Sequence, residues 1–281
     1  MSDNNIRISI IIPCYNQGQY IDEAIKSVEE YKYNDYEIII INDGSTDEFT
    51  NKHLLELKDK GYHVLFQENQ GLSSTRNNGI RLAKGKYILP LDADNKIKAE
   101  YIIKAIEILD GNSSISIVYS DRQLFGNSNE LKRVGELNVA KIIRENYIDA
   151  CAIFRKTIWT EIGGYDETML IGLEDWDFWL SSIEKGFRFF YVPEPLFSYR
   201  VVDNSMIHQL YINPSLDTLI KSIYIKHSLL MKDEFIEEIF RQKNEINKLN
   251  LELNLVKQSK AYRIGKFILK PFSKLKNRLN A

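Results

Sequence analysis

Two aspartates separated by one residue stand directly after an apolar run that is typical of a buried strand. The run is Tyr87 to Leu91, and the acids are Asp92 and Asp94 with Ala93 between them. Carboxylates on a chain that leaves a strand end can face one hard cation with their oxygens. A Mg²⁺ or Mn²⁺ ion held there would bridge two phosphates and neutralise the charge on a departing diphosphate. A turn flanked by surface acids is the alternative, and the strand end argues against it, because two such carboxylates repel each other unless a cation or donors offset them.

A second carboxylate follows another apolar run, Glu37 to Ile41. The segment Asn42-Asp43-Gly44-Ser45-Thr46-Asp47 has the residue types of a turn and a helix cap, and a cap alone would explain it. The Asp43 carboxylate could also accept the imide N–H of a uracil or thymine ring, which cytosine lacks. A structural role and a nucleotide-binding role therefore both remain open for this segment.

A basic residue lies near the start of a helix predicted over Leu72 to Ala83. The guanidinium of this residue, Arg76, could bind phosphate oxygens with bidentate geometry. An ion pair of Arg76 with Asp43 or Asp92 is the structural alternative, and the two interpretations are compatible.

Three acids begin a further predicted helix, Asp175 to Lys185, which is otherwise apolar and aromatic. They are Glu174, Asp175 and Asp177, and their position at a helix N-terminus is explained by the helix dipole alone. One of these carboxylates could instead take the proton of a sugar hydroxyl, with an aromatic face packed on the ring. We interpret Trp176 and Trp179 as core residues in preference to ligand contacts.

The elements that must position these side chains alternate regularly between strand and helix. Short β-branched runs predict strands buried on both faces of a parallel sheet. Apolar residues at helical spacing, such as Ile21, Ala24, Ile25 and Val28, predict helices that pack on that sheet. The alternation continues to a strand at Ile115 to Tyr119, which implies βαβ units and ligand sites at the carboxyl ends of the strands. We therefore predict an α/β fold with a mostly parallel mixed sheet flanked by helices.

The pattern becomes less regular after Tyr119. Asp121 to Asp149 is polar, and we expect it to form a substrate-specific loop region with one helix near Val139 to Arg144. Regularity returns with a strand near Ala150 to Phe154. Beyond it we predict a helix and two strands, Arg188 to Val192 and Leu196 to Arg200.

The last segment has a different periodicity, so we predict a domain over residues 1–225 and a helical extension over 226–281. Apolar residues recur at heptad spacing from Phe235 to Val256, with Gln242 as the polar exception, which favours a coiled coil and a homo-oligomer. Lys260 to Ala281 carries seven basic residues and no acid. Ile264, Ile268, Leu275 and Leu279 share its opposite face, so this segment could lie on an anionic membrane surface, or both segments could pack on the body or a second subunit.

The bulk composition excludes several classes of protein. Hydrophobic residues make up 44% of the 281, which excludes global disorder, and no apolar run has the length of a membrane span. The chain outside its basic end is acidic, which argues against nucleic acid as a partner. Two cysteines give no disulfide framework, and the first residues lack the layout of a secretion signal, so we expect reduced thiols and a cytoplasmic location, with association at the inner face of the membrane as an option.

Taken together and in this order, the motifs resemble those of the family 2 glycosyltransferases, over about Ile6 to Met206. The resemblance implies the GT-A fold, inversion at the sugar, a nucleotide-diphospho-sugar donor carrying uridine or thymidine, a carbohydrate or lipid-linked acceptor, and Mn²⁺ or Mg²⁺. By family analogy the product belongs to a surface polysaccharide or glycolipid. The resemblance also implies a role for each site residue: Asp175 as general base with Glu174 orienting the acceptor; Pro13, Tyr15, Asn16, Asp43, Gly71, Arg76, Asp92 and Ala93 binding the nucleotide-sugar; Asp92 and Asp94 as the metal-binding DxD pair; and Gly163-Gly164-Tyr165-Asp166 as the turn into the acceptor site.

The sequence departs from this family at one place. Many members carry a His a few residues after a Tyr-Arg pair, whereas Tyr199-Arg200 is followed by Val201, Val202 and Asp203. His208 is the nearest candidate for the third metal ligand, with Asp203 or an extra water as alternatives.

Two other classes of function compete with a transferase. A non-catalytic nucleotide-sugar-binding subunit of a glycan-synthesis complex could assemble through the coiled coil, but such a protein has no need to keep the DxD pair, Arg76 and Asp175 together. A dinucleotide-dependent dehydrogenase requires a Gly-rich phosphate turn after the first strand. Pro13-Cys14-Tyr15-Asn16 is not such a turn.

Overall fold

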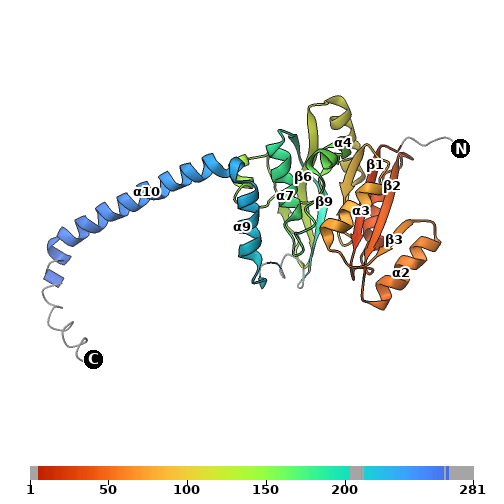
Figure 1. Cartoon of the computed structure of the whole chain (residues 1–281), viewed down its shortest axis with the longest axis horizontal. Helices are drawn as coiled ribbons and strands as arrows, with labels where there is room; N and C mark the ends of the chain where they lie inside the picture. Colours follow the sequence, from red (N-terminus) through yellow and green to blue (C-terminus); the bar gives the residue numbers. More distant parts are fainter. Residues whose placement is uncertain (1–5, 203–209, 211, 263, 266–281) are drawn as a thin grey trace, which may run out of the picture. The chain divides into compact units, whose positions relative to one another are not determined.

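The structure is a computed structural model that describes residues 6–202, 210, 212–262 and 264–265. Its contacts divide the chain into two units, residues 1–227 and residues 228–281, which are described separately below. Figure 1 gives the order of the elements along the chain. The domain boundary expected at 225–226 lies close to this division and stays a prediction.

The N-terminal half of the first unit is a parallel sheet made from the predicted β-branched runs. Its strands are parallel to each other in the order β3-β2-β1-β4, and they comprise β1 (Ile8–Cys14), β2 (Tyr36–Asp43), β3 (His63–Gln67) and β4 (Tyr87–Pro90). All seven residues of β1 are buried, as expected for a strand covered on both faces.

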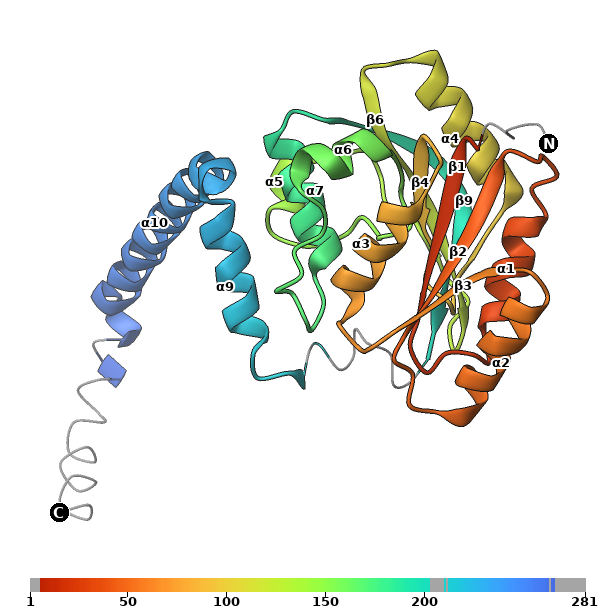
Figure 2. The same ribbon diagram turned by 45° about the vertical axis from the view of Figure 1, so that its right-hand side comes forward.

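Helices cover the two faces of this sheet. The side chains on one face of β1, including Ile10 and Ile12, belong to a single core. The same core contains residues of α1 (Ile21–Glu29), α2 (Glu48–Asp59) and α4 (Ala99–Gly111). The opposite face receives α3 (Leu72–Leu82), where a Cβ at Gly79 would lie 2.5 Å from Ile11 and 2.7 Å from Ile41. Figure 2 shows α3 and α7 on one side of the strands and α1 and α2 on the other.

The C-terminal half of the sheet adds antiparallel neighbours. The order continues from β4 as β8-β6-β9-β5, with β8 antiparallel to both β4 and β6, and β6 parallel to β9. These strands are β5 (Lys96–Ile97), β6 (Ile115–Gly126), β8 (Ile153–Arg155) and β9 (Arg188–Val201), with β7 (Leu131–Lys132) paired to β6. The predicted mixed, mostly parallel sheet flanked by helices is confirmed.

Two strand predictions in this half are wrong in extent. The strand predicted to end at Tyr119 continues to Gly126, through residues expected to form a loop. The two strands predicted from Arg188 onward form one strand, β9, which continues through Pro193 and Pro195. Register shifts on either side of Asp121 let β6 and β9 stay paired around those prolines, which cannot donate hydrogen bonds to a ladder.

Several short helices complete the first unit. They are α5 (Val139–Ile142), α6 (Lys156–Ile162), α7 (Glu174–Glu184) and α9 (Leu216–Lys226), of which α6 and α9 were not predicted. Gly163 ends α6 in a left-handed conformation at φ 97°, the usual stop for a helix.

The second unit contains α10 (Ser228–Gln258), one continuous helix that spans the predicted heptads. Among the described residues, no helix combines the length and the hydropathy required to cross a membrane. The predictions for Lys266 to Ala281, including Ile268, Leu275 and Leu279, lie outside the described residues, as do those for Asp203 and His208.

Candidate functional site

Arg76 joins two acidic segments that are far apart in the sequence. Its side chain is 1% exposed, and one terminal nitrogen donates to Asp92 Oδ1 at 2.7 Å while the other donates to Glu174 Oε1. Burial lowers the pKa of Arg76, but the negative charges of Asp92 and Glu174 outweigh this effect, so its pKa is raised. Of the two predicted partners, Arg76 therefore pairs with Asp92 and not with Asp43. The pairing fixes the loop after β4 against the first turn of α7.

Asp94 lies on the same loop as Asp92 and is partly buried. Burial and the nearby charge of Asp92 raise the pKa of Asp94 to about 7. Gln17 Nε2 donates to Asp94 Oδ2 at 3.3 Å, and Arg200 Nε donates to the Asp94 main-chain oxygen at 2.9 Å. The positive charge of Arg200 opposes this rise in pKa but does not cancel it, so a divalent cation would further stabilise the ionised carboxylate.

The donor chemistry at this loop fits a hard cation in part. Among the residues that the structure describes, no three His, Cys, Asp or Glu side chains are grouped to hold a metal ion. Asp92 and Asp94 together can supply carboxylate oxygens, and Mg²⁺ characteristically binds through one or two carboxylates together with waters and substrate phosphates.

The Asp43 carboxylate holds the loop that precedes α3. Its Oδ1 accepts from Gln67 Nε2 and from the Gln70 N–H, both at 2.8 Å, and its Oδ2 accepts from the Gly71 N–H at 3.0 Å. Three of about four acceptor positions on the carboxylate are thus used within the chain. One acceptor position remains for an external donor such as an imide N–H.

Asn16 joins the turn after β1 to the turn after β2. Asn16 Oδ1 accepts from the main-chain N–H groups of Thr46 and Asp47 at 2.7 and 3.1 Å, and Asn16 has a left-handed backbone at φ 53°. Asn therefore suits this position both by its conformation and by its amide. Tyr15 is 46% exposed beside it, whereas Pro13 is buried within β1.

Asp175 stands at the second residue of α7, next to Glu174. Its Oδ1 accepts from Asn146 Nδ2 at 2.9 Å and from the Trp176 N–H at 2.8 Å. Burial and the charge of Glu174 raise the pKa of Asp175 to about 7. The residue as a whole is only partly buried, and its carboxyl group has a near-neutral pKa. That combination suits a general base.

The other prominent residues of α7 serve the core. The indole N–H of Trp176 donates to the Ile142 carbonyl oxygen at 2.6 Å, and that of Trp179 donates to the Ile148 carbonyl oxygen at 3.2 Å. Both rings are buried, in agreement with their interpretation as core residues.

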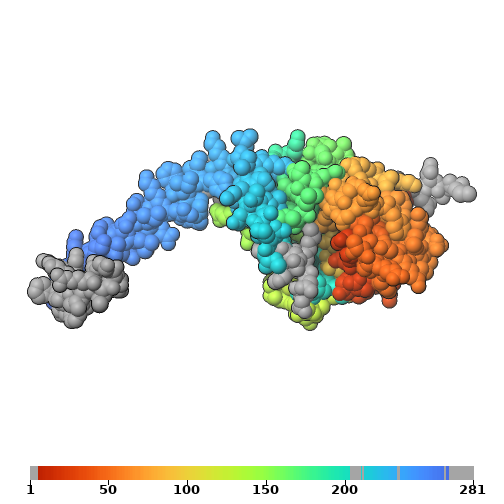
Figure 3. Space-filling view, turned by 60° about the horizontal axis from the view of Figure 1, so that its bottom comes forward, coloured from red at the N-terminus to blue at the C-terminus, as the bar shows by residue number. Residues whose placement is uncertain are grey.

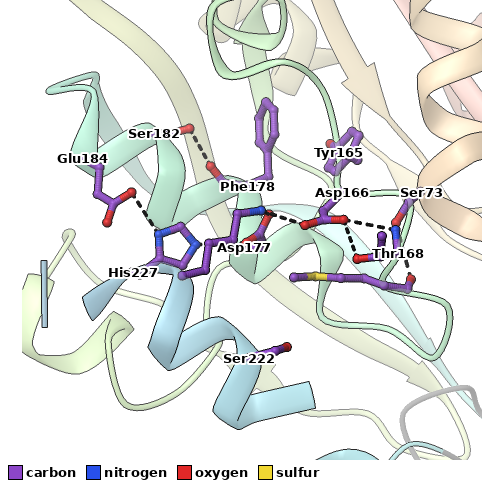
Figure 4. A network of polar contacts seen from close by, with 12 residues as sticks. Ser73, Tyr165, Asp166, Thr168, Asp177, Phe178, Ser182, Glu184, Ser222 and His227 are labelled. Carbon is purple, nitrogen blue, oxygen red and sulfur yellow. Dashed lines mark hydrogen bonds and ion pairs between the residues drawn. The ribbon is translucent and has the colours of Figure 1, made fainter. Parts of the chain in front are cut away.

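Asp177 fastens α9 to α7 (Figure 4). Its carboxylate oxygens lie 2.8 Å from Lys226 Nζ and 2.9 Å from His227 Nε2, and Lys226 also reaches Asp166 at 2.8 Å. His227 Nδ1 lies 3.0 Å from a Glu184 carboxylate oxygen. Burial lowers the pKa of His227, but the hydrogen bonds to Asp177 and Glu184 outweigh this and raise it. The third acid of α7 is thus structural.

The turn Gly163-Gly164-Tyr165-Asp166 is fixed to α3 by Asn77. The Asn77 Oδ1 accepts from Trp159 Nε1 and the Tyr165 N–H, both at 2.9 Å, and its Nδ2 donates to the Tyr165 carbonyl oxygen at 2.9 Å. Figure 3 shows the orange surface around α3 adjoining the green surface around α6. The turn therefore lies close to Arg76, which directly precedes Asn77 in α3.

Asp149 is an acidic residue that the sequence patterns did not single out. Burial and the charge of Asp92 raise its pKa, although Arg122 lowers it. The charge of Asp149 also raises the pKa of Asp94 and of Asp175, so the acids after β4 and at the start of α7 share one electrostatic environment. In the sequence, the feature that could have indicated Asp149 is its position directly before the apolar residues 150–154.

Comparisons with known proteins bear on the family and the fold of this chain. The model of the family described as glycosyl transferase family 2 matches residues 9–165. The chain is 30% identical to an uncharacterized glycosyltransferase of Haemophilus influenzae over 70% of this chain and 66% of that protein. It is 33% identical to one of Rickettsia prowazekii over 72% of this chain and 64% of that protein. A relative in Rickettsia conorii is 30% identical over 65% of this chain but only 31% of its own length.

Two solved structures show the same fold at low sequence identity. S. aureus TarS residues 1–349, in complex with UDP-GlcNAc, has a TM-score of 0.64 and 18% identity and covers 78% of this chain and 66% of its own. A mannosyltransferase of Pyrobaculum calidifontis, in complex with GDP-Man and Mn²⁺, has a TM-score of 0.55 and 14% identity, over 93% of this chain and 83% of its own. The expectation of a GT-A fold is confirmed.

Proposed function

This chain belongs to glycosyl transferase family 2, and we propose that it is an inverting glycosyltransferase that moves a sugar from a UDP- or dTDP-sugar to an acceptor hydroxyl. The observation that carries the proposal is the double pairing of Arg76 with Asp92 and Glu174. It brings the acids suited to the diphosphate side next to the acid suited to the hydroxyl side. One bound donor and one acceptor could then meet between them.

On the donor side, Asp43 receives the imide N–H of a pyrimidine base in its remaining acceptor position. Asp92 and Asp94 would hold the divalent cation, which neutralises charge on the diphosphate as it leaves. UDP-GlcNAc in TarS and GDP-Man with Mn²⁺ in the Pyrobaculum enzyme support a nucleotide-sugar and a metal of this kind.

On the acceptor side, Asp175 takes the proton of the attacking hydroxyl group. The hydroxyl oxygen forms a bond to the anomeric carbon while the bond from that carbon to the diphosphate oxygen breaks on the opposite face. The configuration at the anomeric carbon is therefore inverted. Glu174, fixed by Arg76, orients the acceptor, and Asn146 keeps the Asp175 carboxylate in place.

The proposal is tested by separating binding from transfer. UDP-GlcNAc, a dTDP-sugar and GDP-Man are titrated by calorimetry with and without Mn²⁺, and release of the nucleoside diphosphate measures turnover. Asp94→Asn is expected to abolish the Mn²⁺-dependent part of binding, and Asp175→Asn is expected to keep binding but remove turnover. Asp59→Asn, which removes an exposed acid at the end of α2, is the matched control and should change neither.

Turnover that survives in Asp175→Asn would contradict the assignment of the base. Binding without turnover in the wild-type chain, over a range of acceptors, would favour the alternative of a nucleotide-sugar-binding subunit in a glycan-synthesis complex. The carboxyl group of Asp175, whose pKa is raised to about 7 by burial and by the charge of Glu174, favours the enzyme, because a binding subunit has no use for such a group.

The wider role proposed is the synthesis of a surface polysaccharide or glycolipid in the cytoplasm, at the inner face of the membrane. The basic residues of 260–281 support contact with an anionic surface. Liposomes with and without anionic lipid, mixed with the full chain and with a chain lacking residues 260–281, test this location by co-sedimentation.

A further inference from the structure

Six residues of α10 form a seam at heptad spacing. The seam consists of Ile239, Gln242, Ile246, Leu249, Leu253 and Val256, separated alternately by three and four residues. Its apolar members are well exposed; for example, Ile246 is 57% and Leu249 56% exposed. Apolar residues repeated every 3.5 residues favour the winding of one helix around another.

Charged residues flank this seam in a fixed order. In the heptad that places Ile239, Ile246 and Leu253 at position a, the g positions are Glu238, Glu245 and Glu252. The e positions that follow each of them by five residues are Lys243, Asn250 and Lys257. Thus one edge of the seam is acidic throughout, and the other carries lysine without any acid.

The order of charges distinguishes between two directions of pairing. In a parallel, in-register pair, each g residue meets the e residue five positions later on the partner helix, so Glu238 meets Lys243 and Glu252 meets Lys257. In an antiparallel pair, g residues meet g residues and e residues meet e residues. The seam would then place glutamate against glutamate and lysine against lysine, which is repulsive.

The seam residues also favour a coiled coil of two helices over one of three or four. Ile239 and Ile246 at position a, with Leu249 at position d, follow the pattern typical of parallel dimers, whereas Leu253 at position a with Val256 at position d does not. Gln242 is the polar residue of the seam, and a polar side chain there pairs best with its own copy, which fixes the register. In the single chain, Gln242 donates to Glu238 at 2.9 Å, a contact that pairing would exchange for one across the seam.

We propose that α10 is the dimerisation element of this protein and that its partner is a second copy of the same chain, in a parallel, in-register, two-stranded coiled coil over residues 238–257. The arrangement joins both copies of residues 1–227 to the same end of the coil. It is independent of the reaction that the first unit performs.

The first test is the mass of the full chain by light scattering and sedimentation over a hundredfold range of concentration. A mass of two copies is expected. Ile246→Asp with Leu249→Asp should reduce it to one copy. Leu251→Asp with Leu255→Asp is the matched control, because these leucines are exposed on the same helix but lie outside the seam. Circular dichroism shows whether both variants stay folded.

A wild-type chain that is monomeric throughout the range overturns the proposal, and a mass of three or four copies overturns the two-stranded arrangement. A control variant that dissociates as fully as the seam variant shows that the contact lies elsewhere on α10. Binding of UDP-GlcNAc is irrelevant to each of these outcomes, so they are separate from a failure of the proposed function.

The second test is the direction of the pair. Gln242→Cys should form an intermolecular disulfide on mild oxidation, because the two copies of position 242 face each other in a parallel pair. In an antiparallel pair centred on the same seam they would be about 16 Å apart, far beyond the reach of a disulfide. The native Cys14 and Cys151 are buried, so they should contribute little background to the cross-linking. A dimeric Gln242→Cys chain that does not cross-link overturns the parallel arrangement.

Discussion

Asp175 offers a test in which stability and activity change in opposite directions. Its carboxyl group is held among acids, with burial and the charge of Glu174 raising its pKa to about 7. Replacing Asp175 by Asn removes the charge but keeps an oxygen that can accept from Asn146 and from the Trp176 N–H. We therefore expect Asp175→Asn to be more stable than the wild type at neutral and higher pH, and to be inactive.

The size of the effect follows from linkage. The ordinary pKa of this group is 3.8, so folding raises it by about three units, which corresponds to about 4 kcal/mol. Because Asp175 is partly exposed, solvent screening reduces this value, and we expect a gain of about 2 kcal/mol in the free energy of unfolding at pH 8. A carboxyl group whose pKa is raised in the folded state destabilises the fold once it ionises. The gain from Asn should therefore shrink as the pH falls below about 7, and vanish near pH 4.

The measurement is unfolding in guanidinium chloride at several pH values, without metal or nucleotide. Asp166→Asn is the control of opposite sign. Burial raises the pKa of Asp166, but hydrogen bonds from Lys226 and Thr168 outweigh this and lower it to about 2, so loss of its charge should destabilise the protein at pH 8. A loss of stability in Asp175→Asn at pH 8, or a gain that is the same at every pH, would refute the reasoning.

Three further predictions concern turnover, the buried ion pairs and the packing of α3. The kcat/KM of the wild type should rise with pH and level off above about 7, because Asp175 must be ionised to take a proton; a flat profile would contradict its role. Arg76→Met should destabilise the protein by about 3–5 kcal/mol in chemical denaturation, because Glu174 is left buried without a cation, and adding Glu174→Met should recover much of the loss; no recovery would contradict this cause. Gly79→Ala should destabilise the protein by about 1–3 kcal/mol, measured by thermal melting, since the added Cβ would lie 2.5 Å from Ile11. Gly111→Ala is the control: nothing lies within 4 Å of its added Cβ, so thermal melting should show a neutral or slightly stabilising effect.

Local patterns in the sequence were sufficient for the parts of the fold that have one dominant periodicity. The β-branched runs of β1 and β2 predict strands because few other structures bury such residues on both faces. The position of Asp92 directly after an apolar run placed it at a strand end, and α3 begins at the residue expected.

Features that depend on pairing between distant segments were not predicted from local patterns. The residues from Asp121 to Gly126 look like a loop because they are polar, yet they form a strand because β9 supplies their hydrogen bonds. Arg76 and Glu174 are separated by 98 positions, and nothing local to either one indicates the other. Asp149 was overlooked for the same reason, since its importance comes from Asp92 and Arg122 and not from a motif.

The contacts of Asp177 have a practical consequence for shortened versions of the protein. Lys226 and His227 are the last residues of the first unit, and they supply the basic partners of an acid that is nearly inaccessible to water. A truncation that stops at residue 225 would leave this acid uncompensated two positions after Asp175. Expression of the first unit alone should therefore extend beyond His227, or poor yield and a displaced α7 would be mistaken for a property of the site.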